Sequence, residues 1–255
     1  MTEKTIGLIA AMPEEVAPLI SRVGPVKQEK LAGFPLYRFT CGGKDVVLIE
    51  SGIGAQRADQ AIRALLGATT PDVILNFGFG GSALPGPNVG DIVLADRFLV
   101  YKERLLTDQE GLSPALTDEL ATRLELQCRG MNYRVYRGTF VTSAEIIGKQ
   151  ILSGLLPVTA TTPVLEMETA AVAKVAWARK VPLIAVRAIS DWAEEELDFS
   201  IADFTDREMR ISVWKVLWTI ARKPRIIPQL VRLGNNSRLA GENLAEVVKM
   251  VLEML

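Results

Sequence analysis

Short apolar runs alternate with amphipathic stretches along most of the chain, and this alternation is its main structural signal. Each run is about one strand long, and several are apolar at consecutive positions, which is typical of strands covered on both faces. On this basis strands are predicted at Thr5–Ala10, Asp45–Glu50, Asp72–Phe77, Asp91–Ala95, Tyr136–Thr142 and Pro182–Ile189.

The segments between these runs carry apolar residues at helical spacing. Pro13–Ile20 has its proline in the first turn and places Val16, Leu19 and Ile20 on one face. Thr205 and Glu208 have the spacing of a capping box at the start of another helix. Helices are therefore predicted at Pro13–Ile20, Gln56–Leu66, Pro114–Leu126, Thr169–Arg179 and from Thr205 to Ile220. Strands alternating with helices predict an α/β fold, a three-layer α/β/α domain with a mixed central sheet.

The end of the chain has a different character. Basic residues and no acidic ones occur from Arg222 to Gly241, and Pro224 and Pro228 are predicted to break the helix there, so that a closing helix begins at Glu242. We therefore expect a main domain at residues 1–221 and a basic, helical C-terminal extension at 222–255. A solvated basic face is favoured over a membrane-surface patch.

Composition restricts the class of protein. Of 255 residues 49% are hydrophobic, and the formal net charge is -1, which favours a packed core and argues against binding to nucleic acid. No uncharged run reaches the roughly 18 residues of a membrane span. The opening stretch MTEKTIGLIAAM carries an early acid and is not expected to be a signal peptide. Cys41 and Cys128 stand alone, as ordinary thiols of a cytoplasmic protein do.

The chain contains no histidine. A Ser-His-Asp triad, a Cys-His dyad and a histidine-ligated zinc site are therefore excluded. Acid–base chemistry must fall to carboxylates, tyrosine or lysine.

Carboxylates and glycine-rich turns follow the predicted strands. Ligand sites in open α/β sheets gather at the carboxyl ends of strands, so we expect these residues to share one rim of the sheet. Each has a simpler reading, since Glu15 could favour a helix dipole, Asp191 could cap a helix, and the glycines could form tight turns. The candidate elements are Glu15, Gly52–Gly54, Gly78–Gly81, Glu168 and Asp191.

An ordered set of motifs resembles the nucleoside phosphorylase/nucleosidase superfamily, nearest to its 5'-methylthioadenosine/S-adenosylhomocysteine nucleosidases. The motifs are GLIAAMPEEV, SGIG, NFGFGG, VGDIVLAD, LEMETAAVA and VRAISD, within about residues 5–220. The resemblance implies a nucleoside phosphorylase-like fold and hydrolysis of the N-glycosidic bond of a 5'-modified adenosine, releasing adenine. It implies that Asp191 donates a proton to purine N7 and that Glu15 activates the water. Glu168 would bind the ribose hydroxyls, with Met167 packed under the sugar.

The resemblance also implies further contacts with the nucleoside. The backbone of Ile147 would recognise the base, and Ile53, Phe79, Gly80 and Ser190 would lie against the substrate. The family usually has phenylalanine where this chain has Ile146 and, by alignment, Ile201. These departures suggest a different 5' substituent, and related branches act on futalosine or adenosylhopane.

The nucleophile is inferred from charge. A phosphorylase binds an anion, usually through arginines, and the family's usual arginine positions lie in stretches that read AAMPEE and NFGFGG here. Water is therefore favoured, although Arg57 after SGIG leaves a phosphate-dependent phosphorylase open. A nucleoside-binding protein without catalysis is the rival from another class. We expect a small-molecule nucleoside substrate, no metal or cofactor, and a homodimer, as is common in this family.

Overall fold

The computed structural model describes residues 4–144, 147, 149–191 and 227–255, with backbone alone at 149–150 and 227–230. The helix predicted from Thr205 to Ile220 and the predicted domain boundary after residue 221 lie outside these residues, and the division into two units stays a prediction. The elements are β1 (Thr5–Ala10), α1 (Pro13–Ile20), β2 (Lys27–Leu31), β3 (Phe34–Cys41), β4 (Lys44–Glu50), α2 (Ala55–Ala68), β5 (Val73–Ser82), β6 (Ile92–Lys102), β7 (Leu105–Asp108), α3 (Pro114–Gln127), β8 (Val135–Ser143), α4 (Lys149–Leu155), β9 (Val164–Glu166), α5 (Thr169–Ala178), β10 (Leu183–Asp191) and α7 (Ile227–Met254).

The sheet is mixed, and part of it closes on itself. Its strand order is β10-β6-β8-β9-β5-β1-β4-β3-β2, with β7 paired to β6, and β10 also pairs with β5. The strands from β10 to β5 therefore form a ring, while β1, β4, β3 and β2 extend from it. β1, β4, β5 and β10 run parallel to their neighbours in this set, so their carboxyl ends meet at one rim.

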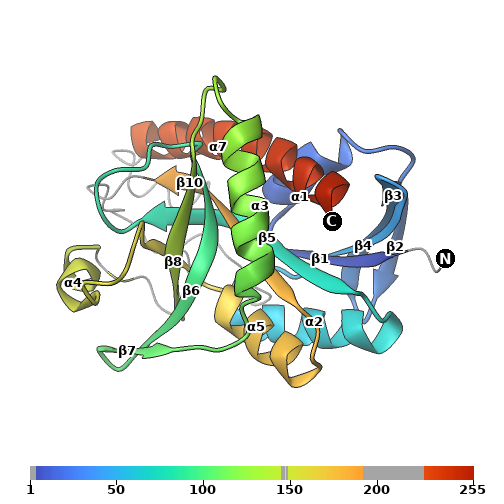
Figure 1. The fold of residues 1–255 in the computed structure, drawn as a ribbon, viewed down its shortest axis with the longest axis horizontal. Coiled ribbons are helices and arrows are strands. Elements are labelled where there is room, and N and C mark those ends of the chain that lie inside the picture. The colour runs from blue at the N-terminus through green and yellow to red at the C-terminus, as the bar shows by residue number, and fades with distance from the viewer. Residues whose placement is uncertain (1–3, 145–146, 148, 192–226) are drawn as a thin grey trace.

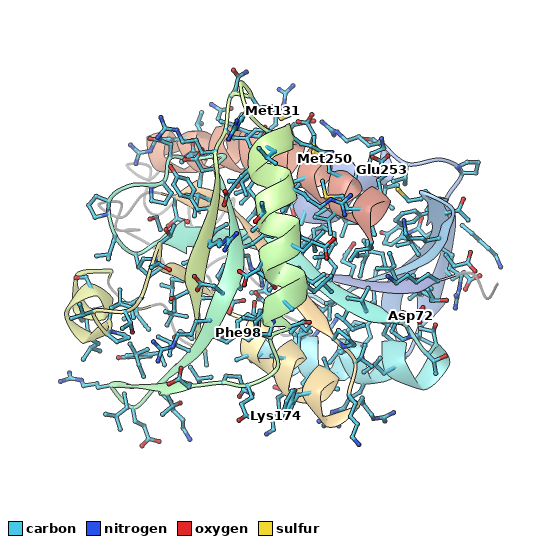
Figure 2. The ribbon with its side chains drawn as sticks, in the orientation of Figure 1. Asp72, Phe98, Met131, Lys174, Met250 and Glu253 are labelled. Atoms are coloured by element: carbon cyan, nitrogen blue, oxygen red, sulfur yellow. The ribbon has the colours of Figure 1, made fainter. Side chains whose placement is uncertain are left out.

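Helices cover both faces of the sheet, which confirms the predicted three layers. Figure 1 shows α1 and α7 on one side of the sheet and α2 and α5 on the other. Side chains of β1 therefore alternate between the two faces of the sheet. Ile6 and Leu8 pack with α1 and α7, while Ile9 packs with α2. Side chains fill the space between these layers (Figure 2).

The structure corrects two sequence predictions. The closing helix begins at Ile227, not at Glu242. Pro228 falls in its first turn, where a missing N–H costs nothing, and packing of the later turns outweighs the low helix propensity of the glycines and asparagines before Glu242. The hairpin β2–β3 was not predicted, because β2 is polar and exposed, while β3 buries alternate residues but contains Pro35.

α7 is part of the main core. Its buried side chains include Leu244, Val248 and Leu252, which pack with β1 and α3. Its last carbonyl groups accept hydrogen bonds from Lys4 Nζ (2.7 Å to Leu255 O) and Lys44 Nζ (3.0 Å to Leu252 O). Cations there complement the negative end of the helix dipole. No helix in the described ranges is both long and apolar enough to cross a membrane.

The buried face of α7 should be essential for stability. Leu244→Ala is expected to lower the free energy of unfolding by about 2–5 kcal/mol, because Leu244 is fully buried and a cavity would remain. Val231→Ala is the matched control on the same helix, since Val231 is 59% exposed, and it should change stability by less than about 1 kcal/mol. Urea unfolding measures both, and equal effects would contradict this role of α7.

Candidate active site

Glu15 lies at the carboxyl end of β1 and its carboxylate is enclosed. Oε2 accepts the N–H groups of Ala11 (2.8 Å) and Met12 (2.9 Å), and Oε1 accepts the Phe79 N–H (2.8 Å). The hydrogen bond from the Met12 N–H spans the first turn of α1, so Glu15 also stabilises the start of this helix. Burial raises the pKa of Glu15 although these N–H groups and Arg187 act in the opposite direction. A buried carboxylate with a raised pKa is suited to take up a proton.

Asp191 ends β10, on the other side of β5. The Ser190 hydroxyl donates to Asp191 Oδ1 (2.9 Å), and the register of β10 shifts between Ile189 and Asp191. This bulge directs the aspartate across Gly81, with which it pairs. The side chain of Asp191 is thereby held against the same strand that supports Glu15.

Two glycines of β5 make room for these acids. A Cβ at Gly78 would lie 2.7 Å from Glu15 Oε1, and a Cβ at Gly81 would lie 2.5 Å from Asp191 Oδ2. Real Cβ atoms do not approach other atoms this closely, so neither position admits a side chain without moving a carboxylate. The turn predicted at Gly78–Gly81 is therefore wrong, because these glycines lie inside β5 and allow the close approach of two carboxylates.

Glu168 reaches this rim by a different route. β9 runs antiparallel to β5, and Glu168 follows it as the N-cap residue of α5. Glu168 Oε1 accepts the Gly54 N–H (2.8 Å), next to Ile53, and Oε2 accepts the Met167 N–H (3.3 Å). The side chain is partly exposed, as a group that binds a ligand must be.

Glu166 is the buried partner of a guanidinium. Arg187 Nη2 donates to Glu166 Oε2 (2.7 Å) and to Asn76 Oδ1 (2.9 Å), and the hydroxyls of Thr142 and Thr169 also donate to Glu166. The side chains of Arg187 and Glu166 are 2% and 0% exposed. Burial opposes the charge of Glu166, but Arg187 and the two hydroxyls outweigh it and lower the pKa.

Among the residues that the structure describes, no cation forms an ion pair with Glu168, because Arg187 is paired with Glu166. Burial raises the pKa of Glu168 to about 7, and the negative charge of Glu166 adds to the rise. The guanidinium of Arg187 acts in the opposite direction but is held by Glu166. Glu168 is therefore half protonated near neutral pH in the free protein.

The structure brings most of the predicted site residues together. Hydrogen bonds or strand pairing join Glu15 to Phe79, Glu168 to the Gly54 turn, and Asp191 to Ser190 and Gly81. The Ser190 hydroxyl also reaches Gly80 O (3.4 Å). The side chain of Ile147 is 7% exposed and packs in a small core beneath α4. Ile146 and Ile201 lie outside the described residues.

Sequence reasoning missed the role of Arg187, and of Asn76 as its partner. A clear signal was present, since an arginine in the apolar run LIAVRAIS must be buried and must find a carboxylate. Arg57, left open as an anion ligand, donates from Nε to Ser51 O (3.1 Å), and its guanidinium lies 4.7 Å from the centre of the Phe34 ring.

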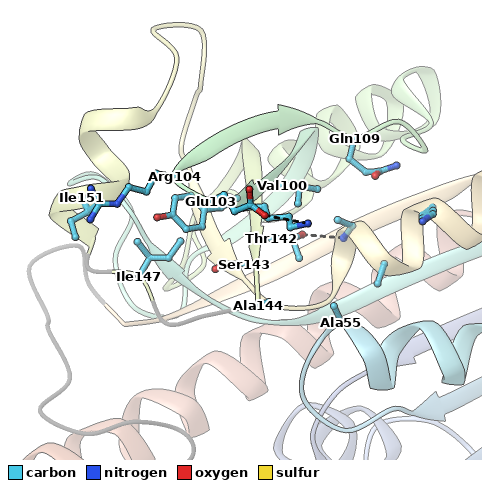
Figure 3. A pocket seen from close by; sticks show the side chains of 15 residues that line it. Ala55, Val100, Glu103, Arg104, Gln109, Thr142, Ser143, Ala144, Ile147 and Ile151 are labelled. Atoms are coloured by element: carbon cyan, nitrogen blue, oxygen red, sulfur yellow. Dashed lines mark hydrogen bonds and ion pairs between the residues drawn. The ribbon is translucent and has the colours of Figure 1, made fainter.

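A cavity of about 790 Å³ lies next to residues that border the carboxylate cluster, and its lining includes none of Glu15, Glu168 and Asp191. It reaches from Ala55, next to the turn that binds Glu168, to the β6–β7 hairpin, and Figure 3 shows Glu103 and Arg104 of that hairpin facing Ile147 and Ile151. Its wall includes Thr142, the partner of Glu166. The cavity therefore adjoins the carboxylate cluster.

Comparison with known proteins identifies the family. A model of the phosphorylase superfamily matches residues 5–221. A 5'-methylthioadenosine/S-adenosylhomocysteine nucleosidase of Actinobacillus succinogenes is 33% identical over 231 residues, which cover 85% of this chain and 98% of the relative.

Solved structures agree on the fold. The nucleosidase of the same name from Neisseria meningitidis, in complex with methylthio-immucillin-A, has a TM-score of 0.76 at 23% identity, covering 99% of this chain and 100% of that chain. Futalosine hydrolase of Helicobacter pylori has a TM-score of 0.72 at 17% identity, covering 99% and 98%. The nucleoside phosphorylase-like fold is thereby confirmed, and the chain belongs to the phosphorylase superfamily.

Proposed function

We propose that this protein hydrolyses the N-glycosidic bond of a 5'-modified adenosine and releases adenine. The observation that carries the proposal is the cluster of Glu15, Glu168 and Asp191 at one rim of the sheet, each held by backbone or hydroxyl donors. The relative from Actinobacillus succinogenes is named for such a reaction on methylthioadenosine and S-adenosylhomocysteine, and it matches along nearly its whole length.

The proposed reaction divides the work among three carboxylates. As the bond between C1' and the purine breaks, its electron pair passes to the base, and Asp191 supplies the proton that neutralises N7. A water molecule forms the new bond to C1', and Glu15 takes the proton that it loses. Glu168 accepts hydrogen bonds from the ribose hydroxyls, and its charge favours the oxocarbenium-like sugar of the transition state.

Charge supports water over phosphate as the nucleophile. The carboxylates of Glu15, Glu166 and Glu168 share the field of a single buried guanidinium in the described part of the site, and Glu166 already pairs with it. A phosphate ion would meet net negative charge there and would lack the arginine donors that it requires. The position of Arg57 against Phe34 and Ser51 O supports the same conclusion.

The cavity supports a substituent larger than a methylthio group as a second candidate. A volume of about 790 Å³ is within the range of sites that enclose drug-sized ligands. Futalosine or adenosylhopane would need such space, and the likeness to futalosine hydrolase in fold is consistent with the first of these. The main proposal holds for either size of substituent.

Adenine release decides the reaction. We expect phosphate-independent release of adenine from methylthioadenosine or S-adenosylhomocysteine, and loss of nearly all turnover in Asp191→Asn, which keeps the shape of the side chain but cannot supply the proton. Chromatographic assay of adenine with and without phosphate measures both. Phosphate-dependent release would make the protein a phosphorylase. Release of adenine from adenosylhopane alone, or of hypoxanthine from futalosine alone, would select the larger substituent.

Glu168 should couple activity and stability to pH in opposite directions. Ribose hydroxyls donate to the charged carboxylate, so kcat/KM should rise as pH increases through about 7, the pKa of this group. The pKa of Glu168 in the folded protein lies above the ordinary value of 4.5, so the protonated group favours the folded state. Its contribution to the free energy of unfolding is complete below pH 4.5 and is lost as the pH rises through 7.

Glu168→Gln should therefore have a higher Tm than the unmodified protein at pH 8 but not at pH 4.5. The increase should be about 2–4 °C for each kcal/mol gained in the free energy of unfolding. Glu166→Gln is the matched control with the opposite sign, because it leaves Arg187 buried and unpaired and should lower Tm at pH 8. Thermal denaturation at the two pH values measures these shifts. A lower Tm for Glu168→Gln at pH 8 would refute the assignment.

We also propose that the protein is a cytoplasmic homodimer. Both cysteines are buried and unpaired, which suits a reducing compartment. Large apolar side chains are exposed near the cavity, on β7, α4 and α5, and a second copy would cover them in a symmetric interface. They are Leu105 (67% exposed), Ile151 (59%), Leu155 (39%) and Trp177 (57%).

Sedimentation equilibrium should give twice the chain mass of 27.9 kDa. Ile151→Glu should shift the protein toward the monomer, because a charge would be buried in the interface. Leu126→Glu, at an exposed position on α3, is the matched control and should leave the dimer intact. A monomer at micromolar concentration in the unmodified protein would overturn the proposal.

A further inference from the structure

One turn of the C-terminal helix contacts residues that hold both proposed catalytic acids, Glu15 and Asp191, in place. We call Leu239–Asn243 the α7 wedge. It lies in the part of α7 that packs against α1 and β10. Neither the family motifs nor the proposed reaction gives this segment a role.

The first contact is made by Gly241. A Cβ at this position would lie 3.0 Å from Glu14 O, 3.3 Å from Pro18 Cγ and 3.5 Å from Phe79 Cζ. The helix surface therefore rests directly on the backbone beside Glu15 and on the ring of Phe79, whose N–H donates to Glu15. Movement of α7 at this point would press on Phe79, one of the three residues whose N–H groups hold the Glu15 carboxylate, and on the helix turn that carries Glu15.

The second contact is made by Asn243. Its Nδ2–H donates to Gly90 O (2.9 Å), and the Gly90 N–H in turn donates to Ile189 O (2.8 Å). The N–H of Ile189 donates to Asp91 O (2.9 Å), so the Gly90–Asp91 turn holds both backbone groups of the residue before the bulge. This turn thereby fixes the strand end that carries Asp191.

Helix geometry explains how one segment reaches both supports. Residues two apart on an α-helix point about 200° apart, so Gly241 and Asn243 face opposite sides. The close fit holds on both sides, because a Cβ at Gly90 would lie 2.8 Å from Asn243 Nδ2. The wedge thus lies between the segment that carries Glu15 and the turn that holds the end of β10, and it contacts both.

We propose that Gly241 and Asn243 are positioning residues, which act through Glu15 and Asp191 and do not touch substrate. The inference rests on the proposed function, because the acids must act together on one nucleoside. A displacement of about 1 Å in catalytic groups can reduce turnover a hundredfold, so a small shift of the wedge should appear in kcat.

Gly241→Ala and Asn243→Ala should lower kcat roughly tenfold or more with a smaller change in KM, because neither residue contacts Glu168, which holds the ribose in the proposed reaction. Asn243→Asp is a second test, since it keeps the size of the side chain but presents an acceptor to Gly90 O. The matched controls lie on the same helix: Gly234→Ala, where a Cβ would meet no atom within 4 Å, and Asn235→Ala at an exposed position. Both controls should keep the kcat of the unmodified protein.

Amide hydrogen exchange tests the wedge without any assay of turnover. Gly241→Ala should accelerate exchange at the Phe79 N–H, and Asn243→Ala at the N–H groups of Gly90 and Ile189, with no change in the controls. Unchanged exchange and unchanged kcat in folded variants would overturn the proposal. An equal rise in KM and fall in kcat/KM would also overturn it. Absence of adenine release by the unmodified protein would instead refute the proposed function, and the exchange result would still decide whether the wedge holds these strand ends.

Discussion

The buried ion pair between Arg187 and Glu166 determines the electrostatics of the whole rim. Removing either charge would leave the other in a site where neither side chain is more than 2% exposed, and such a loss is strongly destabilising. The pair is completed by Asn76 and by the hydroxyls of Thr142 and Thr169, so strands β5, β8 and β10 and the start of α5 meet at one point. This one cluster therefore links strands of the ring through side chains and orders the charges at its rim.

The same pair separates the behaviour of two neighbouring glutamates. Glu166 takes the guanidinium and stays ionised, whereas Glu168, two residues later, lies in the field of Glu166 and has a pKa of about 7. Groups whose surroundings push their pKa values apart are a common arrangement in active sites. One buried arginine thus makes one carboxylate structural and leaves the other available for a ligand.

The sequence predicted the elements for which local sequence propensity and packing in the folded protein favour the same structure. β1 and α1 have the predicted bounds, because TIGLIA is buried along its length and Pro13 starts a helix with one apolar face. The prediction began α7 at Glu242 because the preceding turns contain Gly234, Asn235 and Asn236, and the buried residues that stabilise the helix lie in its later turns.

For the site, motifs located the three carboxylates but not what holds them. The contact of Asn76 with Arg187 joins residues 111 positions apart, and no local pattern encodes it. Similarly, the Gly90 turn reaches the end of β10 because β6 pairs with β10, which spacing along the chain does not reveal.

The glycines of β5 have a consequence for how such a protein can change. One bare strand is in contact with two acids at once, Glu15 over Gly78 and Asp191 over Gly81. A new side chain at either position would displace a reacting group before it could contact a ligand, so this strand offers little freedom for adaptation. Altered selectivity has to arise at the periphery, where the β6–β7 hairpin and α4 border the cavity and their exposed residues can vary without disturbing the acids. The architecture thereby separates a mutationally rigid centre from a tolerant margin.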